Sequence, residues 1–312
     1  MTTAPDMLSH FGGVPVASAA HTNPWTTAYF VDGTNGTAGA GGLSPDDATT
    51  TINQAVTLAE AGDVIYVRQL TPQVTDLTEP TVYTDNIVIP VTKYGLSIIG
   101  TGNNPHNPFY TMIKPGATGY GIQVLGASFL FENMAINRSS ASTGVIFLDG
   151  DNSTSKNAWG TLISNCHIRN ANSKANAGIL TYAGSYNTVY RCFFTGCHSS
   201  IVAASGASFP CRSFVVDSCN FNPGQQYPAG GRDIDVGGGS SFFELLIRNC
   251  NFMMTPTGGF ILITSGTYGA IQNCYFGDSA VTCSTTGADI NIPTTVFLSG
   301  CYDAAADTIA TT

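Results

Sequence analysis

Charged side chains are scarce in this chain of 312 residues, at 10 % of the sequence against the ~25 % of an ordinary soluble domain. Basic residues are the rarer sign, and the net charge of −9 argues against a nucleic-acid or anionic-membrane partner. No apolar run approaches the ~18 residues of a membrane span, so we expect none. The first basic residue is Arg68, so the N-terminus lacks the features of a secretion signal, and we expect synthesis in a reducing cytoplasm.

What the chain has instead is two short motifs that recur in step. The first reads apolar-x-x-Asn-Cys-x-apolar and repeats every 24 to 31 residues. Its cysteines are Cys166, Cys192, Cys219, Cys250, Cys274 and Cys301, and a degenerate copy has Met134 in their place. The second motif is centred on isoleucine and appears at 121–124, 144–147, 178–181, 200–203, 233–236, 260–263 and 289–292. Both motifs are β-branched and bounded by turn residues, so they predict strands. A shared period of this length predicts a solenoid whose coils are built from short strands, an all-β parallel β-helix.

The first motif can be read position by position. Because strand side chains alternate, the Cys and the apolar residue two places later share a face, and we place both inside. The preceding residue is Asn in four copies, which suits a tight left-handed bend once per coil. Asn amides stacked there can hydrogen-bond along the axis. Arg191 breaks this pattern, and we expect its coil to bend differently.

The nine cysteines do not fit a metal site, because spacings near 27 residues match no compact zinc motif. Six belong to the internal column, where we expect free thiols that pack as small hydrophobes, with disulfides between neighbouring coils as the alternative. Cys197, Cys211 and Cys283 remain unassigned. No cofactor is expected.

The N-terminal part predicts a cap on the solenoid. A strand at 29–31 precedes a Gly-rich turn, a helix over 45–61 with Ser44 as N-cap and Gly62 at its end, and a strand at 64–67. We expect this helix to close the open end of the coils. The predicted parts are an extended arm at 1–28, a cap at 29–94, the β-helix at 95–302 and a small polar tail at 303–312.

These N-terminal motifs carry a resemblance. The segments 29–36, 42–46, 51–56 and 62–67 resemble the cap of pectate-lyase-like right-handed β-helix proteins, and the likeness continues through the coils to about Tyr302. It implies a right-handed, single-stranded parallel β-helix. It does not fix an activity, because the superfamily includes polysaccharide lyases, glycosidases, adhesins and phage tailspike or virion proteins.

Catalysis on a polysaccharide would need carboxylates that converge on an outer face. The candidates are Asp233 and Asp235 with Arg232, and Asp149 and Asp151 form a second pair in an earlier coil. The simpler explanation is that Asp is common at strand ends and turns. No lyase or polygalacturonase motif of the superfamily is recognisable.

Two apolar features favour binding instead. The arm contains Met7, Leu8, Phe11 and Trp25, too many large apolar groups for a solvated tail, and we expect it to order against a partner rather than remain disordered. On the second motif, Ile146, Leu180 and Val202 should face outward in consecutive coils. Such a patch needs a cover, which could be the chain's own loops, another subunit, or a sugar in a groove with Trp159, Tyr182 or Tyr190.

We therefore expect a structural or adhesion protein, similar to phage virion components of the decoration, fibre or tailspike type. Its arm would dock on other virion proteins, the resemblance implies a homotrimer, and a surface glycan is a further candidate ligand. The expected location is the virion, with an extracellular protein as the alternative. The alternative function is a polysaccharide-degrading lyase or glycosidase on the same fold.

Overall fold

The computed structural model describes residues 26–70, 82–102, 111–116, 119–137, 144–150, 156–169, 177–204, 212–222, 230–236, 242–256, 258–286, 289–305 and 307–309. The predicted arm residues Met7, Leu8, Phe11 and Trp25 lie outside this part of the chain. None of its helices is long and apolar enough to cross a membrane.

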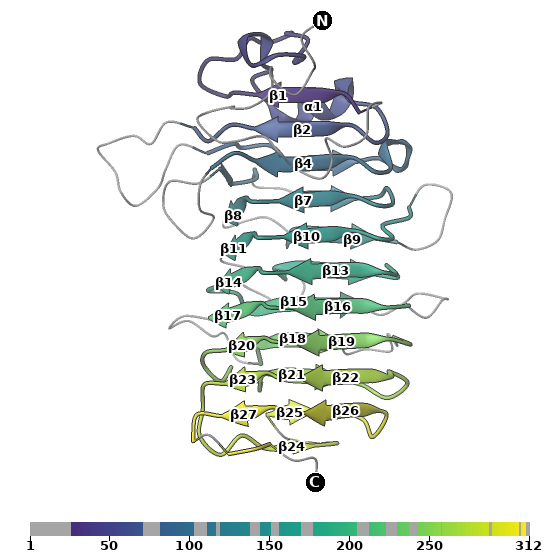
Figure 1. Ribbon diagram of the computed structural model, residues 1–312, viewed down its shortest axis with the longest axis vertical. Helices are drawn as coiled ribbons and strands as arrows, with labels where there is room; N and C mark the ends of the chain where they lie inside the picture. Colours follow the sequence, from purple (N-terminus) through teal and green to yellow (C-terminus); the bar gives the residue numbers. More distant parts are fainter. Residues whose placement is uncertain are drawn as a thin grey trace, which may run out of the picture.

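The chain winds as a right-handed parallel β-helix, with strands of successive coils stacked in three parallel sheets (Figure 1). The first sheet contains β1 (Ala28–Val31), β2 (Val64–Val67), β4 (Ser97–Gly100), β7 (Leu130–Glu132), β10 (Leu162–Ser164), β13 (Asn187–Tyr190), β16 (Phe214–Asp217), β19 (Leu245–Arg248), β22 (Gly269–Gln272) and β26 (Val296–Ser299). The second contains β5 (Met112–Ile113), β8 (Ala135–Asn137), β11 (His167–Arg169), β14 (Phe193–Thr195), β17 (Asn220–Asn222), β20 (Asn251–Phe252), β23 (Tyr275–Phe276) and β27 (Tyr302–Asp303). The third contains β3 (Ile87–Ile89), β6 (Tyr120–Val124), β9 (Gly144–Asp149), β12 (Ile179–Tyr182), β15 (Ser199–Ala204), β18 (Arg232–Val236), β21 (Ile261–Ile263), β25 (Ile290–Asn291) and β24 (Cys283–Ser284). The predicted fold is therefore confirmed.

A single residue with left-handed backbone angles separates the first sheet from the second in successive coils. These residues and their φ angles are Asn133 (57°), Asn165 (49°), Arg191 (50°), Ser218 (56°), Asn249 (54°), Asn273 (53°) and Gly300 (62°). The expectation that Arg191 bends differently is wrong, because the backbone contacts of the neighbouring coils fix the same bend and the Arg191 amide donates to the Asp217 carbonyl at 3.0 Å. The Asn165 amide donates to Asn133 Oδ1 at 3.2 Å, as predicted for stacked amides. This ladder does not extend to Arg191 and Ser218, which lack the amide.

The interior is built from columns of like side chains. The six motif cysteines are buried and free, and each thiol donates to a backbone carbonyl, as Cys166 does to the Ser164 oxygen at 3.1 Å. Burial raises the pKa of Cys166 well above its usual value, so its thiol is protonated. Beside the thiols, Phe194, Phe221, Phe252 and Phe276 stack with ring centroids 5.0, 4.7 and 4.7 Å apart. Cys283 is also buried, and burial raises the pKa of its thiol to about 11.

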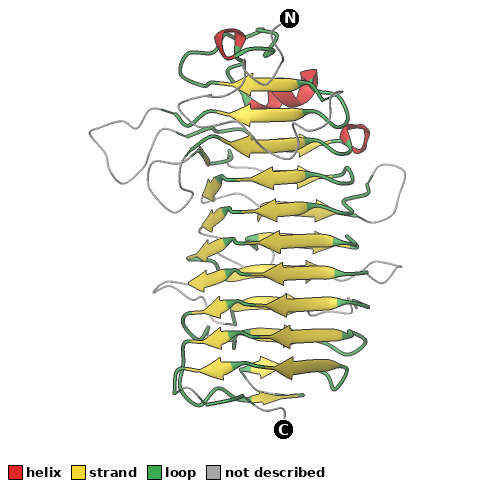
Figure 2. Ribbon diagram, viewed as in Figure 1, coloured by secondary structure: helices red, strands yellow, loops and turns green. Residues whose placement is uncertain are grey.

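The helical cap covers the N-terminal end of the stack, as Figure 2 shows in red. The single helix expected over 45–61 is wrong: Pro45–Asp47 forms a 3-10 turn capped by Ser44, and α1 spans Ile52–Leu58 with Thr51 as its N-cap. Thr49 interrupts the helix because its backbone is extended beside β1, where its amide donates to the Phe30 carbonyl at 2.9 Å and its carbonyl accepts from Asp32 at 2.8 Å.

The C-terminal end is closed by the chain's own last residues. Tyr302 forms an antiparallel bridge with Thr308, and the amide of the buried Ile309 donates to the Cys301 carbonyl at 3.0 Å. The Asp303 carboxylate is buried and accepts from the amides of Ala280, Ala305 and Asp307 at 3.1, 3.0 and 3.0 Å. In the segment expected to be a small polar tail, the described residues Asp303 and Ile309 are therefore packed against the last coil.

Candidate functional site

The predicted catalytic residues lie on β18, but they are buried rather than presented to solvent. Asp233 is 1 % exposed and Asp235 3 % exposed. Burial raises the pKa of Asp233 well above its usual value, so burial favours the protonated form of its carboxyl group. Asp233 Oδ2 and Arg232 Nη1 are both buried, and no described residue hydrogen-bonds to either atom. Because side chains alternate along a strand, Asp233 and Asp235 share one face of β18 and Arg232 lies on the face of Ile234.

The second carboxylate pair does not join Asp233 and Asp235. Asp149 lies on β9, three strands from β18 in the third sheet, so about 14 Å separates the two strands. Asp149 is buried and its Oδ2 lies 3.1 Å from Lys156 Nζ. Asp151 falls outside the described residues. The sequence therefore suggested two acidic pairs that the fold keeps apart.

The outward apolar column of the third sheet differs from the prediction at one position. Ile146 pairs in register with Ile122 and Ile179 and is buried inside the coil, so its predicted outward placement is wrong. In the sequence, Gly144 was aligned with Gly121 and Gly178. The strands instead pair so that the inner isoleucines lie in register, and a shift of one residue moves a side chain from the outer face of the strand to the inner one.

The outward position belongs to Phe147, which pairs with Leu180, and Leu180 pairs with Val202. Phe147 and Leu180 are partly exposed, whereas Val202 is buried. Tyr182 and Tyr190, suggested for a sugar groove, lie on β12 and β13 in different sheets. They and Trp159 are partly buried. The three side chains therefore do not line one strand face.

A surface that sequence reasoning missed lies on the last coils. Most of the described large apolar side chains that are well exposed occur there: Phe243, Met253, Met254, Tyr268, Tyr275, Phe297 and Tyr302. Phe297 is the most exposed of them, at 72 %. The residue after each motif cysteine could have signalled part of this surface, because it changes from Asn to Tyr in the last two copies.

Tyr275 and Tyr302 are paired residues of β23 and β27, so their Cα atoms lie about one strand spacing, ~4.8 Å, apart. They are 45 % and 48 % exposed. In earlier coils the same outward column holds the buried His167 and the partly exposed Phe193, Asn220 and Asn251. The aromatic surface therefore opens only at the C-terminal end.

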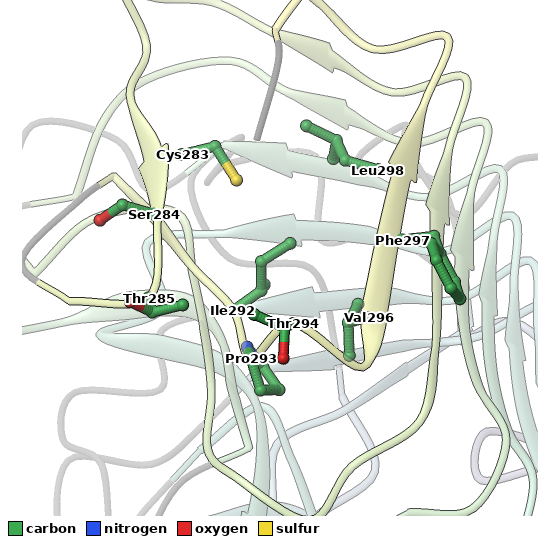
Figure 3. Close-up of a pocket in the computed structure, with 9 residues that line it drawn as sticks. All are labelled: Cys283, Ser284, Thr285, Ile292, Pro293, Thr294, Val296, Phe297 and Leu298. Atoms are coloured by element: carbon green, nitrogen blue, oxygen red, sulfur yellow. The ribbon is translucent and has the colours of Figure 1, made fainter. Parts of the chain in front are cut away.

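A hollow of about 280 Å³ lies at the same end, between β24, β25 and β26 (Figure 3). It is lined by Cys283, Ser284, Thr285, Ile292, Pro293, Thr294, Val296, Phe297 and Leu298. Ile292 and Val296 belong to the interior of the last coil, so the hollow is where the core approaches the end of the stack. Within the described part of the chain, His, Cys, Asp and Glu nowhere gather in a group of three that could hold a metal ion.

Comparison with known protein families and with curated proteins finds no match. Among solved structures, the chain is similar to ORF18 of Geobacillus virus E2 at 15 % identity and a TM-score of 0.47. That match covers 77 % of this chain and 54 % of the phage protein, so the chain spans about half the phage protein's length. It is similar to a pectin methylesterase from Aspergillus niger at 12 % identity and a TM-score of 0.42, over 92 % and 88 % of the two chains. A rhamnogalacturonan lyase is similar at 12 % identity and a TM-score of 0.44, over 89 % and 74 %.

Proposed function

We propose that this chain is a structural and adhesion protein of the virion type. Its N-terminal arm docks on a particle, the β-helix acts as a rigid spacer, and the last coils bind a cell-surface glycan. The buried free thiols fit a protein that folds in a reducing compartment before it is assembled.

The observation that supports this proposal most is the uneven exposure of apolar side chains along the stack. Exposed aromatic and methionine side chains gather in the last coils, at the end opposite the helical cap. Aromatic residues and methionine are enriched where proteins contact partners, and clustered exposed apolar groups mark such surfaces. A docking region at one end and a contact surface at the other suit an attachment protein.

We further propose that the protein is a homotrimer whose subunits contact one another through the partly exposed Phe147 and Leu180. Outward apolar side chains of consecutive coils form a continuous strip along the third sheet. Light scattering after gel filtration should give three times the mass of the 32.5 kDa chain. A monomer, or a trimer that survives Leu180→Glu, would contradict this contact.

Adhesion is tested with the full chain carrying a fluorescent label. We expect saturable binding to at least one member of a panel of bacterial cells and purified surface polysaccharides, with no release of new reducing ends or unsaturated sugars. A variant that lacks residues 1–25 should bind the same cells but no longer attach to the particle. Absence of binding across the panel would overturn the proposal.

The second candidate is a polysaccharide depolymerase, and the raised pKa of Asp233 favours it. A glycosidase needs one protonated carboxyl group and one carboxylate, and Asp235 lies two residues away on the same strand. Cleavage of a polysaccharide that is lost in Asp235→Asn, with unchanged thermal stability, would establish this function and displace the first.

A further inference from the structure

We propose that Tyr275, Tyr302 and Asn273 form a binding subsite for a neutral saccharide, here called the tyrosine shelf. The inference rests on the adhesion role proposed above and assigns its ligand class and location. The shelf lies on the outer face of the second sheet, in its last two coils, β23 and β27.

The two tyrosine rings supply the apolar part of the shelf. Both are close to half exposed, and the strand pairing places them one coil apart. The chain just beyond them carries little side chain. Gly277 has no side chain, and a Cβ there would lie only 2.4 Å from the Met253 carbonyl oxygen. Ala304 has only a methyl group. A flat ligand therefore meets few side chains beside the rings.

The amide of Asn273 supplies polar contacts at the near edge of the shelf. Asn165 and Asn249 use their amides within the stack, on Asn133 Oδ1 and Asp217 Oδ1. The described residues offer no such partner to the Asn273 side chain, which is exposed. The next coil has Gly300 at this position, and a Cβ there would lie 2.5 Å from Asn273 Oδ1, so the amide lies over a residue without a side chain. The exposed amide has two N–H donors that a ligand could use.

The surroundings of the shelf favour an uncharged ligand. The nearby cation, Arg248, is paired with Asp217, with Nη2 and Oδ2 2.8 Å apart. Of the nearby anions, Asp278 accepts from Thr255 Oγ1 and from the Ser279 amide, and Asp307 is exposed beside the Tyr302–Thr308 bridge, where it disfavours an anionic ligand. Sugar rings combine apolar C–H faces with hydroxyl edges, which match tyrosine rings whose phenol group is polar and an amide that donates and accepts.

The exposed area argues for a small ligand rather than another subunit. A tyrosine has roughly 150–250 Å² of surface, so two that are close to half exposed present about 200 Å². A stable subunit interface needs about 800 Å² from each partner. Two or three sugar residues would cover the shelf.

The test is an array of neutral oligosaccharides, with uronate- and sialate-containing oligosaccharides as a second arm, followed by calorimetry with the strongest neutral binder. Tyr275→Ala, Tyr302→Ala and Asn273→Ala should each weaken binding about tenfold. Tyr94→Ala, which removes an exposed ring near the N-terminal end of the stack, should leave affinity unchanged. Thermal unfolding of each variant shows that the coils remain folded.

The results distinguish the shelf from the wider proposal. Suppose that the wild-type chain binds cells. The shelf is then overturned, and adhesion still stands, if no neutral oligosaccharide binds on the array, if acidic oligosaccharides bind better, or if the tyrosine variants keep the wild-type affinity. Failure of the wild-type chain to bind any cell or polysaccharide would overturn adhesion itself. If Tyr275→Phe keeps most of the affinity while Tyr275→Ala loses it, ring stacking is supported as the source of binding.

Discussion

Asp303 occupies the position on β27 that Phe276 holds on β23, so a buried carboxylate ends the column of stacked phenylalanine rings. A fifth ring in this place would lack a partner on its far side. The carboxylate instead collects three backbone amides from two segments, 280 and 305–307, and closes the last coil. This pairing of residues therefore determines where the solenoid stops.

We expect Asp303→Ala to destabilise the protein by about 1–3 kcal/mol, because buried amides lose their acceptor. Asp303→Asn should cost less, since its oxygen can still accept. Asp307→Ala, which removes an exposed side chain from the same segment, is the control. Urea unfolding measures the free energies, and hydrogen exchange should locate the loosening in residues 277–309. Uniform loosening of all coils would contradict a local closure.

The phenylalanine column should be the most sensitive part of the interior. Phe252 is fully buried, stacks on Phe221 and Phe276, and meets Phe260 edge-on with centroids 6.0 Å apart. We expect Phe252→Ala to lower the free energy of unfolding by about 3–5 kcal/mol. Phe243→Ala removes an exposed ring and should change it by less than about 0.5 kcal/mol. Similar effects in denaturant unfolding would show that the column is not a packed core.

The raised pKa of Asp233 gives a stability change with a defined sign. The unfolded chain ionises Asp233 near pH 4, whereas the folded chain keeps it protonated to higher pH. Stability must therefore fall as pH rises from about 4 toward the folded pKa, because the unfolded state binds fewer protons there. Asp233→Asn should be more stable than the wild type at pH 7, and the difference should vanish below about pH 4. A stability gap independent of pH would show that folding leaves the pKa of Asp233 unchanged.

The thiols should be inert in the native protein. The eight described cysteines are buried and free, so none should react with a thiol reagent such as DTNB under native conditions. All nine cysteines of the sequence should react in denaturant, in the absence of any reductant. Rapid native labelling of Cys192 or Cys219, read by peptide mapping, would mean that the coils open far more readily than this packing implies.

The repeated motif made the solenoid predictable because three periodicities agree: the cysteine spacing, the strand alternation and the residue at the bend. Ile146 was misplaced because Gly144 imitates the glycines of neighbouring coils, and only the pairing with Ile122 reveals the register. The helix boundary was misplaced because the backbone of Thr49 hydrogen-bonds to residues of and beside β1. Such a tertiary contact cannot be predicted from local helix propensity.

The candidate site was harder to predict than the fold. Asp233 was identified as a polar residue of interest, but its burial depends on side chains packed from other coils. The exposed tyrosines were missed because exposure depends on what covers a face, and the sequence of one motif does not contain that information. Asp303 was assigned to a polar tail because its partners, such as Ala280, come from another coil.

The bridge between Tyr302 and Thr308 has a consequence for assembly. A parallel stack exposes a row of unpaired amides and carbonyls on its terminal strands, and a second molecule could add there as a further rung. An antiparallel segment laid on that edge offers the wrong polarity for such growth, while the helical cap obstructs the opposite edge. We therefore expect the residues around Thr308 to hinder end-to-end addition of a second molecule at the edge of the second sheet.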